Sequence, residues 1–326
     1  MNPEPLRLGS RKSPMAVSQS GDVARLITER TGRRVEIVGV TTLGDVSREH
    51  LTQIGGTGVF VSALRESLLR GEVDFAVHSL KDLPTGAAPG ITLAAIPARD
   101  DPRDALVARD AAKLADLPPG ARIGTGSPRR AAQVTLLRSD VTCVPIRGNA
   151  NTRLAKVRAG ELDAVVLAYA GLARIGHTDL ISEIFEPDDM VPAPGQGALA
   201  VECRADDTGL AELLATVDHA PTRSAVAAER SLLAALEAGC SAPVGAYAVQ
   251  AGDGRLRLEG VVLGVPGGSF QAAGLDSASG SGRMLIREHS EADAADAAGL
   301  GRELAARMLA LGAAGLMRGK NTDGTE

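Results

Sequence analysis

The stretch RLGSRKSP, residues 7–14, predicts a strand that ends in a tight turn, and the similar stretch RIGTGSPRR returns at residues 122–130. Two more pairs of signatures follow in the same order: VEIVGVTTLGD (35–45) with VTCVPIRGN (141–149), and GEVDFAV (71–77) with GELDAVV (160–166). A single match of this kind is common, but three in one order indicate two related halves. Our hypothesis is a diverged duplication.

Both halves alternate short β-branched strands with amphipathic helical stretches, among them residues 15–30 and 129–138. This alternation is typical of a parallel α/β sheet. Ligands of such sheets bind beyond the carboxyl ends of the strands, where loops lead into helices. Residues 10–13 and 125–129 occupy those positions, and the N–H groups at a helix start suit carboxylates or phosphates. We therefore expect an anion-binding loop in each half.

Two proline-rich segments, PARDDPRD (97–104) and VPAPGQGAL (191–199), predict crossings between the two α/β halves. A strand and helix from 199 to about 217 would return the chain to the first half. The halves would then be joined by a double hinge that permits closure around a ligand, as in periplasmic binding proteins. A helical run, further strands and an alanine-rich helix at 291–314 predict a smaller α+β domain with an antiparallel sheet. The predicted domains are residues 1–98 with 199–218, residues 99–198, and residues 219–326.

Composition limits the class of protein. The chain has 326 residues, 44% hydrophobic and 23% charged, which is the balance of a soluble globular protein with two or three domains. The first residues lack the apolar core of a signal peptide, and no run of 18 apolar residues occurs. We therefore expect a cytoplasmic protein with no membrane segment. Aromatic residues make up only 2%, which argues against nucleic acid as a partner.

The net charge of −5 is unevenly distributed along the chain. Residues 122–174 hold nine Lys or Arg against three acids, a net charge of +6, and the remainder of the chain carries −11. A basic stretch of this kind in an acidic protein predicts an anionic ligand. The alternative is a solvated basic face that binds nothing.

Three cysteines, Cys143, Cys203 and Cys240, show no paired spacing, so neither a disulfide framework nor a metal site is expected. Each thiol can act as a small buried hydrophobic group. Cys143 and Cys203 fall inside predicted strands, whereas Cys240 lies in a predicted loop between Gly239 and Pro243. Covalent chemistry is therefore favoured at Cys240 over the other two thiols.

The segment HSLKDLP, residues 78–84, places several polar side chains at the end of a predicted buried strand. Such an edge is a natural position for an active site. Lys81 can bind an anion while the adjacent Asp82 handles protons or positive charge, although an exposed ion pair on a surface turn explains the same residues. His78 is interpreted as a structural histidine. The glycine-rich GGTG at residues 55–58 fits a mobile lid or an anion cradle.

These segments resemble the signatures of one known family, the hydroxymethylbilane synthases, also called porphobilinogen deaminases. The resemblance runs in order over essentially the whole chain, and the combination of HSLKDLP, GTGSPRR and the Gly-Cys loop is highly specific. The segments that carry it are SRKSP, TLGDV, GGTGVF, AVHSLKDLP, DPRDA, GTGSPRR, IRGN-x-x-TRL, LAYAGLARIG, PAPGQGAL and GCSAPVG.

The resemblance implies a transferase of tetrapyrrole and heme biosynthesis with three domains. The first two would be similar to the paired lobes of periplasmic binding proteins, with the active site between them. Cys240 of the third domain would hold a dipyrromethane cofactor through a thioether bond. Four porphobilinogen molecules would be added head to tail to this primer with loss of ammonia each time, and hydrolysis would release linear hydroxymethylbilane. The family suggests a monomer whose partner is the small-molecule substrate.

Site residues follow from the same resemblance, position by position. The residues implied for the cofactor carboxylates are Lys81, Thr125, Ser127, Arg129 and Arg130, with Cys240 as the point of attachment. Those implied for substrate and growing chain are Arg11, Ser13, Gln19, Arg147, Arg153 and Arg174. Asp82 matches the catalytic carboxylate, which would stabilise the positive charge that develops as ammonia leaves and pass protons to the leaving amine. No metal is implied.

One departure from the family pattern concerns the lid. The family often carries lysines there, where this chain has Thr57 and Ser62, so what replaces those lysines is open. Two other functions stay open from the residues alone. A two-lobed binding module without chemistry explains the halves and the basic stretch, but not a third domain with Cys240. An enzyme with the Cys240 thiol as nucleophile would need a basic partner, and the adjacent sequence shows none.

Overall fold

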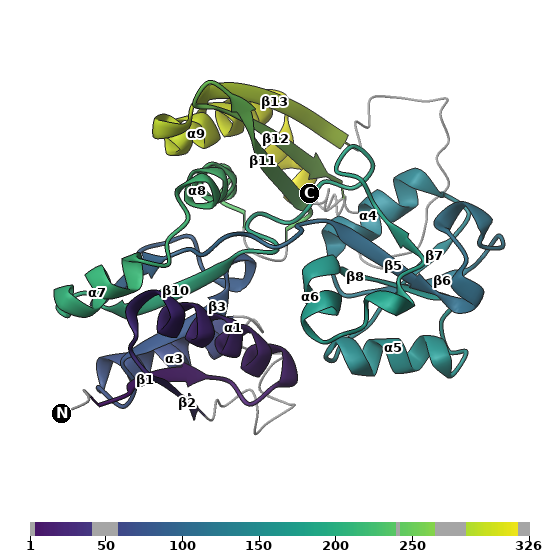
Figure 1. The fold of residues 1–326 in the computed structure, drawn as a ribbon. Coiled ribbons are helices and arrows are strands. Elements are labelled where there is room, and N and C mark those ends of the chain that lie inside the picture. Colours follow the sequence, from purple (N-terminus) through teal and green to yellow (C-terminus); the bar gives the residue numbers. More distant parts are fainter. Residues whose placement is uncertain (1–3, 41–57, 239–241, 265–284, 319–326) are drawn as a thin grey trace, which may run out of the picture. The chain divides into compact units, whose positions relative to one another are not determined.

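The computed structural model of the chain describes residues 4–40, 58–238, 242–264 and 285–318 (Figure 1). Contacts divide the chain into two compact units, which are described separately. The first comprises Met1–Asp100 and Gly195–Arg223, and the second comprises Asp101–Pro194 and Ser224–Glu326. The chain therefore passes between the units three times.

The first unit is built on a five-stranded sheet in the order β2-β1-β3-β10-β4 (Figure 1). Strands β1, β2 and β3 are parallel, whereas β10 is antiparallel to both β3 and β4. The strands are β1 Leu6–Ser10, β2 Val35–Gly39, β3 Phe75–Ser79, β4 Ile91–Ala95 and β10 Leu199–Arg204. The helices are α1 Pro14–Thr31, α3 Gly58–Leu69, α7 Thr208–Ala215 and the short 3-10 helix η2 Leu80–Asp82.

One hydrophobic core holds these elements together. Its buried side chains come from β1, α1, β3, β10 and α7, for example Leu8, Ile27, Phe75, Val201 and Leu214. Burial of such side chains contributes roughly 1.5–3 kcal/mol each. Strand β10 is thus an integral part of this core, although it follows β3 by more than a hundred residues along the chain.

The second unit contains another five-stranded sheet, in the order β7-β6-β8-β5-β9. Strands β6, β7 and β8 are parallel, and β5 is antiparallel to β8 and β9. The strands are β5 Asp104–Ala108, β6 Arg122–Thr125, β7 Thr142–Pro145, β8 Ala164–Ala168 and β9 Glu183–Ile184. The helices are α4 Pro128–Leu137, α5 Ala150–Arg158, α6 Tyr169–Arg174, and the 3-10 helices η3 Arg109–Ala111, η4 Leu114–Asp116 and η5 Thr178–Leu180.

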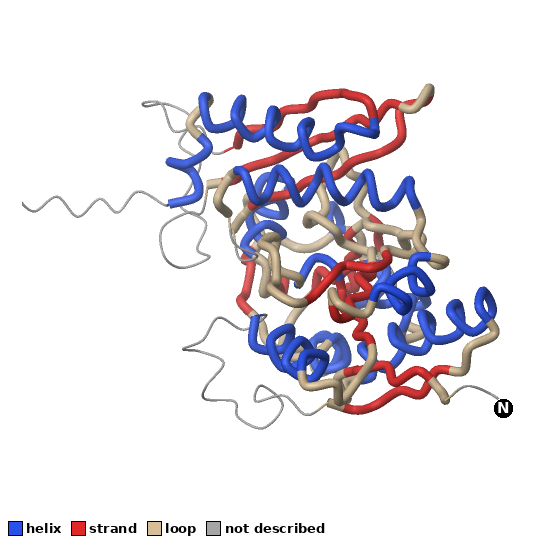
Figure 2. The backbone as a smooth tube through the Cα atoms, turned by 90° about the vertical axis from the view of Figure 1, so that its left-hand side faces the viewer, coloured by secondary structure: helices blue, strands red, loops and turns tan. Residues whose placement is uncertain are grey.

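The second unit also carries an antiparallel three-stranded sheet, β11-β12-β13, at the top of Figures 1 and 2. Its elements are β11 Val244–Gly252, β12 Arg255–Leu263, β13 Leu285–Asp293, η6 Ala294–Asp296, α8 Ala220–Ala235, α9 Ala297–Ala310 and α10 Ala313–Arg318. A Cβ on Gly301 would lie 2.4 Å from the carbonyl oxygen of Ala228, so α9 and α8 can pack this closely only because residue 301 is glycine. The predicted smaller α+β part with an antiparallel sheet is confirmed.

The two five-stranded sheets have the same plan: the order β2-β1-β3-β10-β4 corresponds to β7-β6-β8-β5-β9, with the fourth strand antiparallel in both. The shared GExD signature makes the same contact in each. The Asp74 amide donates to the Arg7 carbonyl (2.8 Å) and its Oδ2 accepts from the Arg7 amide (2.7 Å). Asp163 makes the same two hydrogen bonds with Arg122, at 2.9 and 2.7 Å. This shared plan supports the duplication hypothesis.

Two expectations differ from the structure. The sheets are mixed rather than parallel, because β5 and β10 each follow an extended crossing and have no crossover helix that would impose a parallel direction. The final helix predicted for residues 291–314 begins later: residues 291–293 end β13, and Asp296 caps α9 by accepting a hydrogen bond from the Gly299 amide. Gly312, with φ +99°, then separates α9 from α10.

Candidate functional site

The segment after β3 carries two of the predicted site residues, Lys81 and Asp82, in the 3-10 turn η2. Both side chains are half-buried. The Lys81 ammonium donates to Gln196 Oε1 at 3.2 Å, and the Leu80 amide donates to the Ala198 carbonyl at 3.0 Å. Gly195 permits this close packing, because its φ is +74° and a Cβ there would lie 3.4 Å from the Lys81 amide nitrogen. The PGQG segment therefore holds the Lys81–Asp82 turn in place.

Three further predicted residues lie at the start of α1, beyond the carboxyl end of β1. Ser13 caps the helix by accepting a hydrogen bond from the Ala16 amide, and Pro14 occupies its first turn. Gln19 is 6% exposed and donates to Ser79 Oγ at 2.8 Å, which ties α1 to the end of β3. Arg11 is half-buried in the loop between β1 and α1. Since β1 and β3 are parallel neighbours, all of these residues lie at one edge of the first sheet.

Helix α4 of the second unit begins in the corresponding way. Thr125, the buried last residue of β6, accepts a hydrogen bond from the Ser127 amide at 3.2 Å. Ser127 caps α4 by accepting from the Arg130 amide. A Cβ at Gly126 would lie 2.7 Å from the Ile146 carbonyl oxygen, so only glycine fits between β6 and the chain that follows β7. The loop therefore places the side chains of Thr125 and Ser127 at the start of α4.

Arg129 and Arg130, in the first turn of α4, share one buried carboxylate, that of Asp104. Asp104 is fully buried, and its two oxygens lie 2.8 Å from Arg129 Nη1 and 2.8 Å from Arg130 Nη2. Arg130 Nε also donates to Asp104 at 2.8 Å. Each guanidinium further donates to a backbone carbonyl, Arg129 to Val191 and Arg130 to Val166. We call Asp104, Arg129 and Arg130 the arginine–aspartate cluster; its net charge is +1.

The electrostatics of this cluster are unfavourable for the protein alone. Burial lowers the pKa of Arg129, and the charge of Arg130 lowers it further against the pull of Asp104. Burial and the charge of Arg130 likewise lower the pKa of Arg153, a residue in the first turn of α5 whose Nε donates to the Gly148 carbonyl. In the described part of the chain, Arg129 Nε is buried without a hydrogen-bond partner. Clustered buried cations and an unsatisfied donor are the features that an anionic ligand would complete.

The two remaining predicted arginines lie elsewhere on the second unit. Arg147 is exposed after β7, where it lines a cavity of about 330 Å³ together with Arg122 and Lys156. Arg174 is the half-buried last residue of α6. The sequence around Asp104 does not reveal its role, because nothing there indicates that arginines 25 and 26 positions later would reach its carboxylate.

Another buried carboxylate that the sequence did not reveal lies in the first unit. Glu202 of β10 accepts hydrogen bonds from Arg65 of α3 at 3.0 and 2.7 Å, and its Oε2 lies 3.2 Å from His78 Nε2. Burial alone would raise the pKa of Glu202, but the contacts with His78 and Arg65 outweigh it and lower the pKa to about 2. His78 thus lies buried beside the Arg65–Glu202 ion pair, in line with its interpretation as structural.

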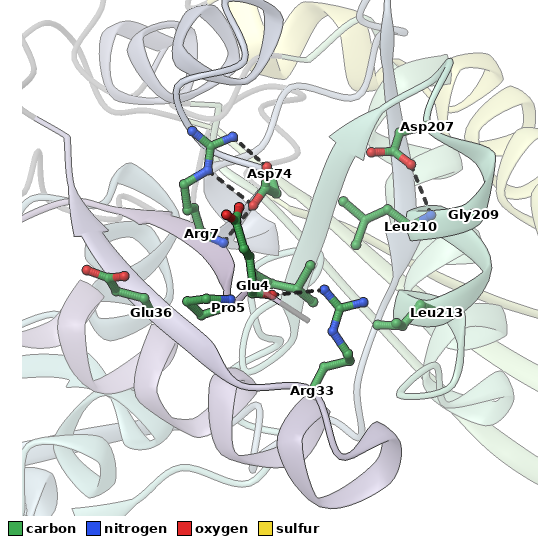
Figure 3. Close-up of a pocket in the computed structure, with 11 residues that line it drawn as sticks. Glu4, Pro5, Arg7, Arg33, Glu36, Asp74, Asp207, Gly209, Leu210 and Leu213 are labelled. Atoms are coloured by element: carbon green, nitrogen blue, oxygen red, sulfur yellow. Dashed lines mark hydrogen bonds and ion pairs between the residues drawn. The ribbon is translucent and has the colours of Figure 1, made fainter. Parts of the chain in front are cut away.

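A cavity of about 750 Å³ in the first unit lies apart from these residues, near the amino-terminal end of β1 (Figure 3). Figure 3 shows that four of its charged side chains have partners: Arg7 pairs with Asp74, Arg33 donates to the Glu4 carbonyl, and Asp207 accepts from the Leu210 amide. None of the predicted site residues lines it. This cavity is therefore not the candidate site.

The two cysteines that the structure describes lie inside strands, as the sequence predicted. Cys143 and Cys203 are buried, and burial raises the pKa of each thiol to about 11, which leaves both largely protonated and poor nucleophiles at neutral pH. Cys240 and Thr57 lie outside the described residues, whereas Ser62 lies on α3. Among described residues, no group of three or more His, Cys, Asp or Glu could hold a metal ion.

The described helices include none with the length and apolarity needed to cross a membrane. Among solved structures, a periplasmic binding protein of Salmonella typhimurium with high arginine specificity matches at 15% identity and a TM-score of 0.36, over 66% of this chain and 92% of its own. The methionine-binding protein MetQ matches at 9% identity and a TM-score of 0.43, over 65% and 89%.

Sequence comparison is far more specific. Residues 6–212 match the family described as porphobilinogen deaminase, dipyromethane cofactor binding domain, and residues 224–310 match its C-terminal domain. The porphobilinogen deaminase of Thermobifida fusca is 59% identical over 314 residues, 96% of each chain. Porphobilinogen deaminase 1 of Streptomyces coelicolor is 58% identical over 325 residues, 97% of this chain and 98% of its own. With both domain families matched and identity this high over nearly the whole length, the chain belongs to the porphobilinogen deaminase family.

Proposed function

We propose that this chain is a hydroxymethylbilane synthase that adds four porphobilinogen molecules, with loss of ammonia each time, to a dipyrromethane primer bonded to Cys240 through a thioether. Hydrolysis would then release the linear hydroxymethylbilane. The observation that carries the proposal is the arginine–aspartate cluster at the start of α4, where two buried guanidinium groups share one carboxylate. Each pyrrole ring bears an acetate and a propionate, so primer and product are polyanions that such a cluster can bind.

The described residues fit the cofactor. Its carboxylates need donors in a dry environment, and Arg129 is 3% exposed with its Nε unsatisfied among the described residues. The hydroxyls of Thr125 and Ser127 and the N–H groups at the start of α4 provide further donors of the right kind. By the family match, Lys81 and Arg130 would complete the set that holds the cofactor. The dipyrromethane, when bound, supplies the free pyrrole carbon to which the first substrate unit is joined.

Asp82 is the proposed catalytic carboxylate. Breaking the bond between carbon and the amine nitrogen of porphobilinogen leaves positive charge on the pyrrole, and the new carbon–carbon bond forms at that carbon. A half-buried carboxylate stabilises this charge and accepts a hydrogen bond from the pyrrole N–H. The same group can pass a proton to the leaving amine and accept the proton that the attacking ring loses. Within the described chain no hydrogen bond or ion pair occupies the Asp82 carboxylate, which leaves it available for a substrate.

Six residues are proposed to hold substrate and the growing chain: Arg11, Ser13, Gln19, Arg147, Arg153 and Arg174. Their side chains differ in how firmly contacts within the protein hold them before a ligand binds. Gln19 is held by Ser79, and Arg153 by the Gly148 carbonyl, so both are positioned before a ligand arrives. Arg147 is exposed and would have to be ordered by the ligand. The fixed pair would therefore favour rigid recognition of the incoming ring, and Arg147 would suit a chain that lengthens.

Three further expectations stand as proposals. The enzyme would have domains at residues 1–98 with 199–218, 99–198 and 219–326, act as a monomer and work in the cytoplasm. The separate sheets of the two α/β halves and the third antiparallel sheet support this division.

Intact mass tests the proposed function. The recombinant chain should be heavier than its sequence by a two-pyrrole adduct that maps to the peptide with Cys240, and brief exposure to porphobilinogen should add further pyrrole units in steps. Cys240→Ser should lack the adduct, whereas Cys203→Ser, at a buried thiol, should keep it in whatever fraction folds. An active chain without any adduct contradicts the cofactor assignment. A chain that binds porphobilinogen without releasing ammonia would instead be a binding module.

A further inference from the structure

The carboxylate of Asp104 lies at the centre of the arginine–aspartate cluster, and no part of the proposed chemistry uses it. Asp104 is the first residue of β5, pairs with Ala168 at the end of β8, and is fully buried. Its position at the carboxyl end of the parallel strands brings it below the first turn of α4. Each of its oxygens lies 2.8 Å from a guanidinium nitrogen: Oδ2 forms an ion pair with Arg129, and Oδ1 forms an ion pair and a hydrogen bond with Arg130.

The contacts fix both arginines from two sides. Arg129 Nη1 lies between Asp104 and the Val191 carbonyl, with distances of 2.8 and 2.7 Å. Arg130 donates through Nε to Asp104 and through Nη1 to the Val166 carbonyl, at 2.8 and 3.2 Å. Long arginine side chains lose about 1.5–2 kcal/mol of rotamer entropy when they are fixed, and here the protein has borne that loss before any ligand binds. Arg129 Nε, which has no hydrogen-bond partner among the described residues, is thus preorganised for an acceptor.

The charge of the cluster is also set by Asp104. Without a negative group, two neighbouring guanidinium groups would be buried with a net charge of +2, and Arg153 close to Arg130 would add to the repulsion. Uncompensated buried charges are strongly destabilising. With Asp104 the cluster retains a net charge of +1, and one carboxylate of the ligand neutralises that charge. A cluster with only one arginine would bind the ligand more weakly. A cluster without the aspartate would have a net charge of +2 and would destabilise the protein in the absence of ligand.

We propose that Asp104 is a positioning residue that holds Arg129 and Arg130 as a preformed, singly charged receptor for a carboxylate of the cofactor. This inference rests on the proposed function, since it takes the dipyrromethane carboxylate to be the ligand of the cluster. It assigns Asp104 no contact with substrate or cofactor. Asp104 acts through the two arginines. Removing its carboxylate should therefore weaken retention of the ligand and leave an excess positive charge in the protein without ligand.

The test compares full-length Asp104→Asn with Asp104→Glu and with Glu202→Gln as a matched control. Glu202 is also a buried carboxylate on the antiparallel strand of a sheet, in contact with Arg65 and His78, but in the other unit. Asn has the shape of Asp without its charge. We measure the fraction of chain that carries the two-pyrrole adduct, the KM and kcat with porphobilinogen, and the thermal midpoint in chloride and in sulfate at equal ionic strength.

Asp104→Asn should lower the fraction of chain with adduct by on the order of tenfold, the factor that corresponds to one lost charge-assisted contact. Its thermal midpoint should rise more than that of the wild type when sulfate replaces chloride, because sulfate supplies the missing negative charge in addition to its general stabilising effect. Asp104→Glu, which keeps the charge, should recover most of the adduct and respond to sulfate as the wild type does. Glu202→Gln should have a lower midpoint in both salts and a normal fraction of adduct.

Several results would overturn the proposal. One is an Asp104→Asn chain with the wild-type fraction of adduct and wild-type KM. Another is a loss of stability that is equal in chloride and sulfate, which indicates a merely structural role. If the Asn variant does not fold, the Glu variant decides, because a folded Asp104→Glu chain without adduct contradicts the charge argument. Failure of the proposed function is distinct, since wild-type chain would then carry no adduct at all.

Discussion

Helices α1 and α4 begin in the same way, with a capping serine followed by proline, yet only α4 has a pair of buried arginines in its first turn. After Ser13-Pro14 the first half has Met15 and Ala16, whereas after Ser127-Pro128 the second half has Arg129 and Arg130. The antiparallel strand differs at the matching place as well. Leu199 pairs with the last residue of β3, and Asp104 pairs with the last residue of β8.

The proposed receptor is therefore a set of three residues, Asp104, Arg129 and Arg130, rather than a property of the fold. In the first half all three positions are apolar, so no charge is buried there. In the second half both arginines and the aspartate are present, so the buried charges balance to +1. Any one of these polar residues alone would be an uncompensated buried charge. Two copies of one fold can thus carry different chemistry only when the residues change together.

A second pair of positions shows what the halves share. Gln19 and Gln133 each lie six residues after the capping serine, and both are buried. Gln19 donates to Ser79 at the end of β3, whereas Gln133 donates to and accepts from the backbone of Val191, which precedes the return crossing. The two glutamines occupy the same position in their helices but have different partners. Gln19 contacts a residue next to the candidate site, whereas Gln133 holds the segment that leads back to the first unit.

The largest effect is expected from placing an aspartate, the counterpart of Asp104, at the matching position of the first half. Leu199→Asp would bury a carboxylate without partners at 15 and 16, and should lower the free energy of unfolding by about 4 kcal/mol. Chemical denaturation measures it. Leu199→Asn, nearly the same in shape but uncharged, is the control and should cost less. Adding Met15→Arg to Leu199→Asp should recover part of the stability; equal losses for Asp and Asn would show that charge is not what separates the halves.

The next largest effect is expected for the proposed catalytic carboxylate, which lies in the first half. Asp82→Asn should fold and keep its adduct but lose turnover by roughly 10²–10³-fold, the range for removing one electrostatic stabiliser of a transition state. Steady-state release of ammonia and intact mass give the two readouts. Near-normal turnover would move the catalytic role to another residue. Asp163→Asn, at a structural aspartate of the second half, is the control and should retain turnover in the folded fraction.

The buried acid on the antiparallel strand of the first half, Glu202, should make stability depend on pH in acid. The pKa of Glu202 is lowered from 4.5 to about 2, so its contribution to stability is fully present above pH 4.5 and is lost as the pH falls toward 2. That contribution is roughly 3 kcal/mol. Glu202→Gln should therefore give an unfolding free energy that changes less between pH 4.5 and 2 than that of the wild type. Parallel curves for the two proteins in this range would contradict the assignment.

The smallest effect is expected at the exposed arginine of the second half. Arg147→Gln should weaken substrate handling by about 1–3 kcal/mol, the range for a lost hydrogen bond to a charged group. The change should appear mainly in KM, with the adduct intact. Arg158→Gln, another exposed arginine of the second half, provides the control. An unchanged KM would show that Arg147 does not bind substrate and is only part of a solvated basic face.

Prediction from the sequence succeeded where the signal was local. The capping Ser-Pro pairs, the glycines at turns and the alternation of strands and helices lie within a few residues of what they specify. The helices predicted for residues 15–30 and 129–138 are therefore close to α1 and α4. The direction of β5 and β10 was missed, since nothing local distinguishes a parallel strand from an antiparallel one. Most residues of the candidate site came from the family resemblance, and their roles remain predictions.

The sequence by itself determined the two α/β halves, the basic stretch, the position of Asp82 after a buried strand and the unusual place of Cys240. Only the tertiary structure decided which charges meet. Arg65 reaches Glu202 across 137 positions of chain, and Arg130 reaches Asp104 across 26. The physical reason is that helix and turn signals act between near neighbours, whereas a buried charge is stabilised by whatever the packing of distant strands and helices brings within hydrogen-bond distance.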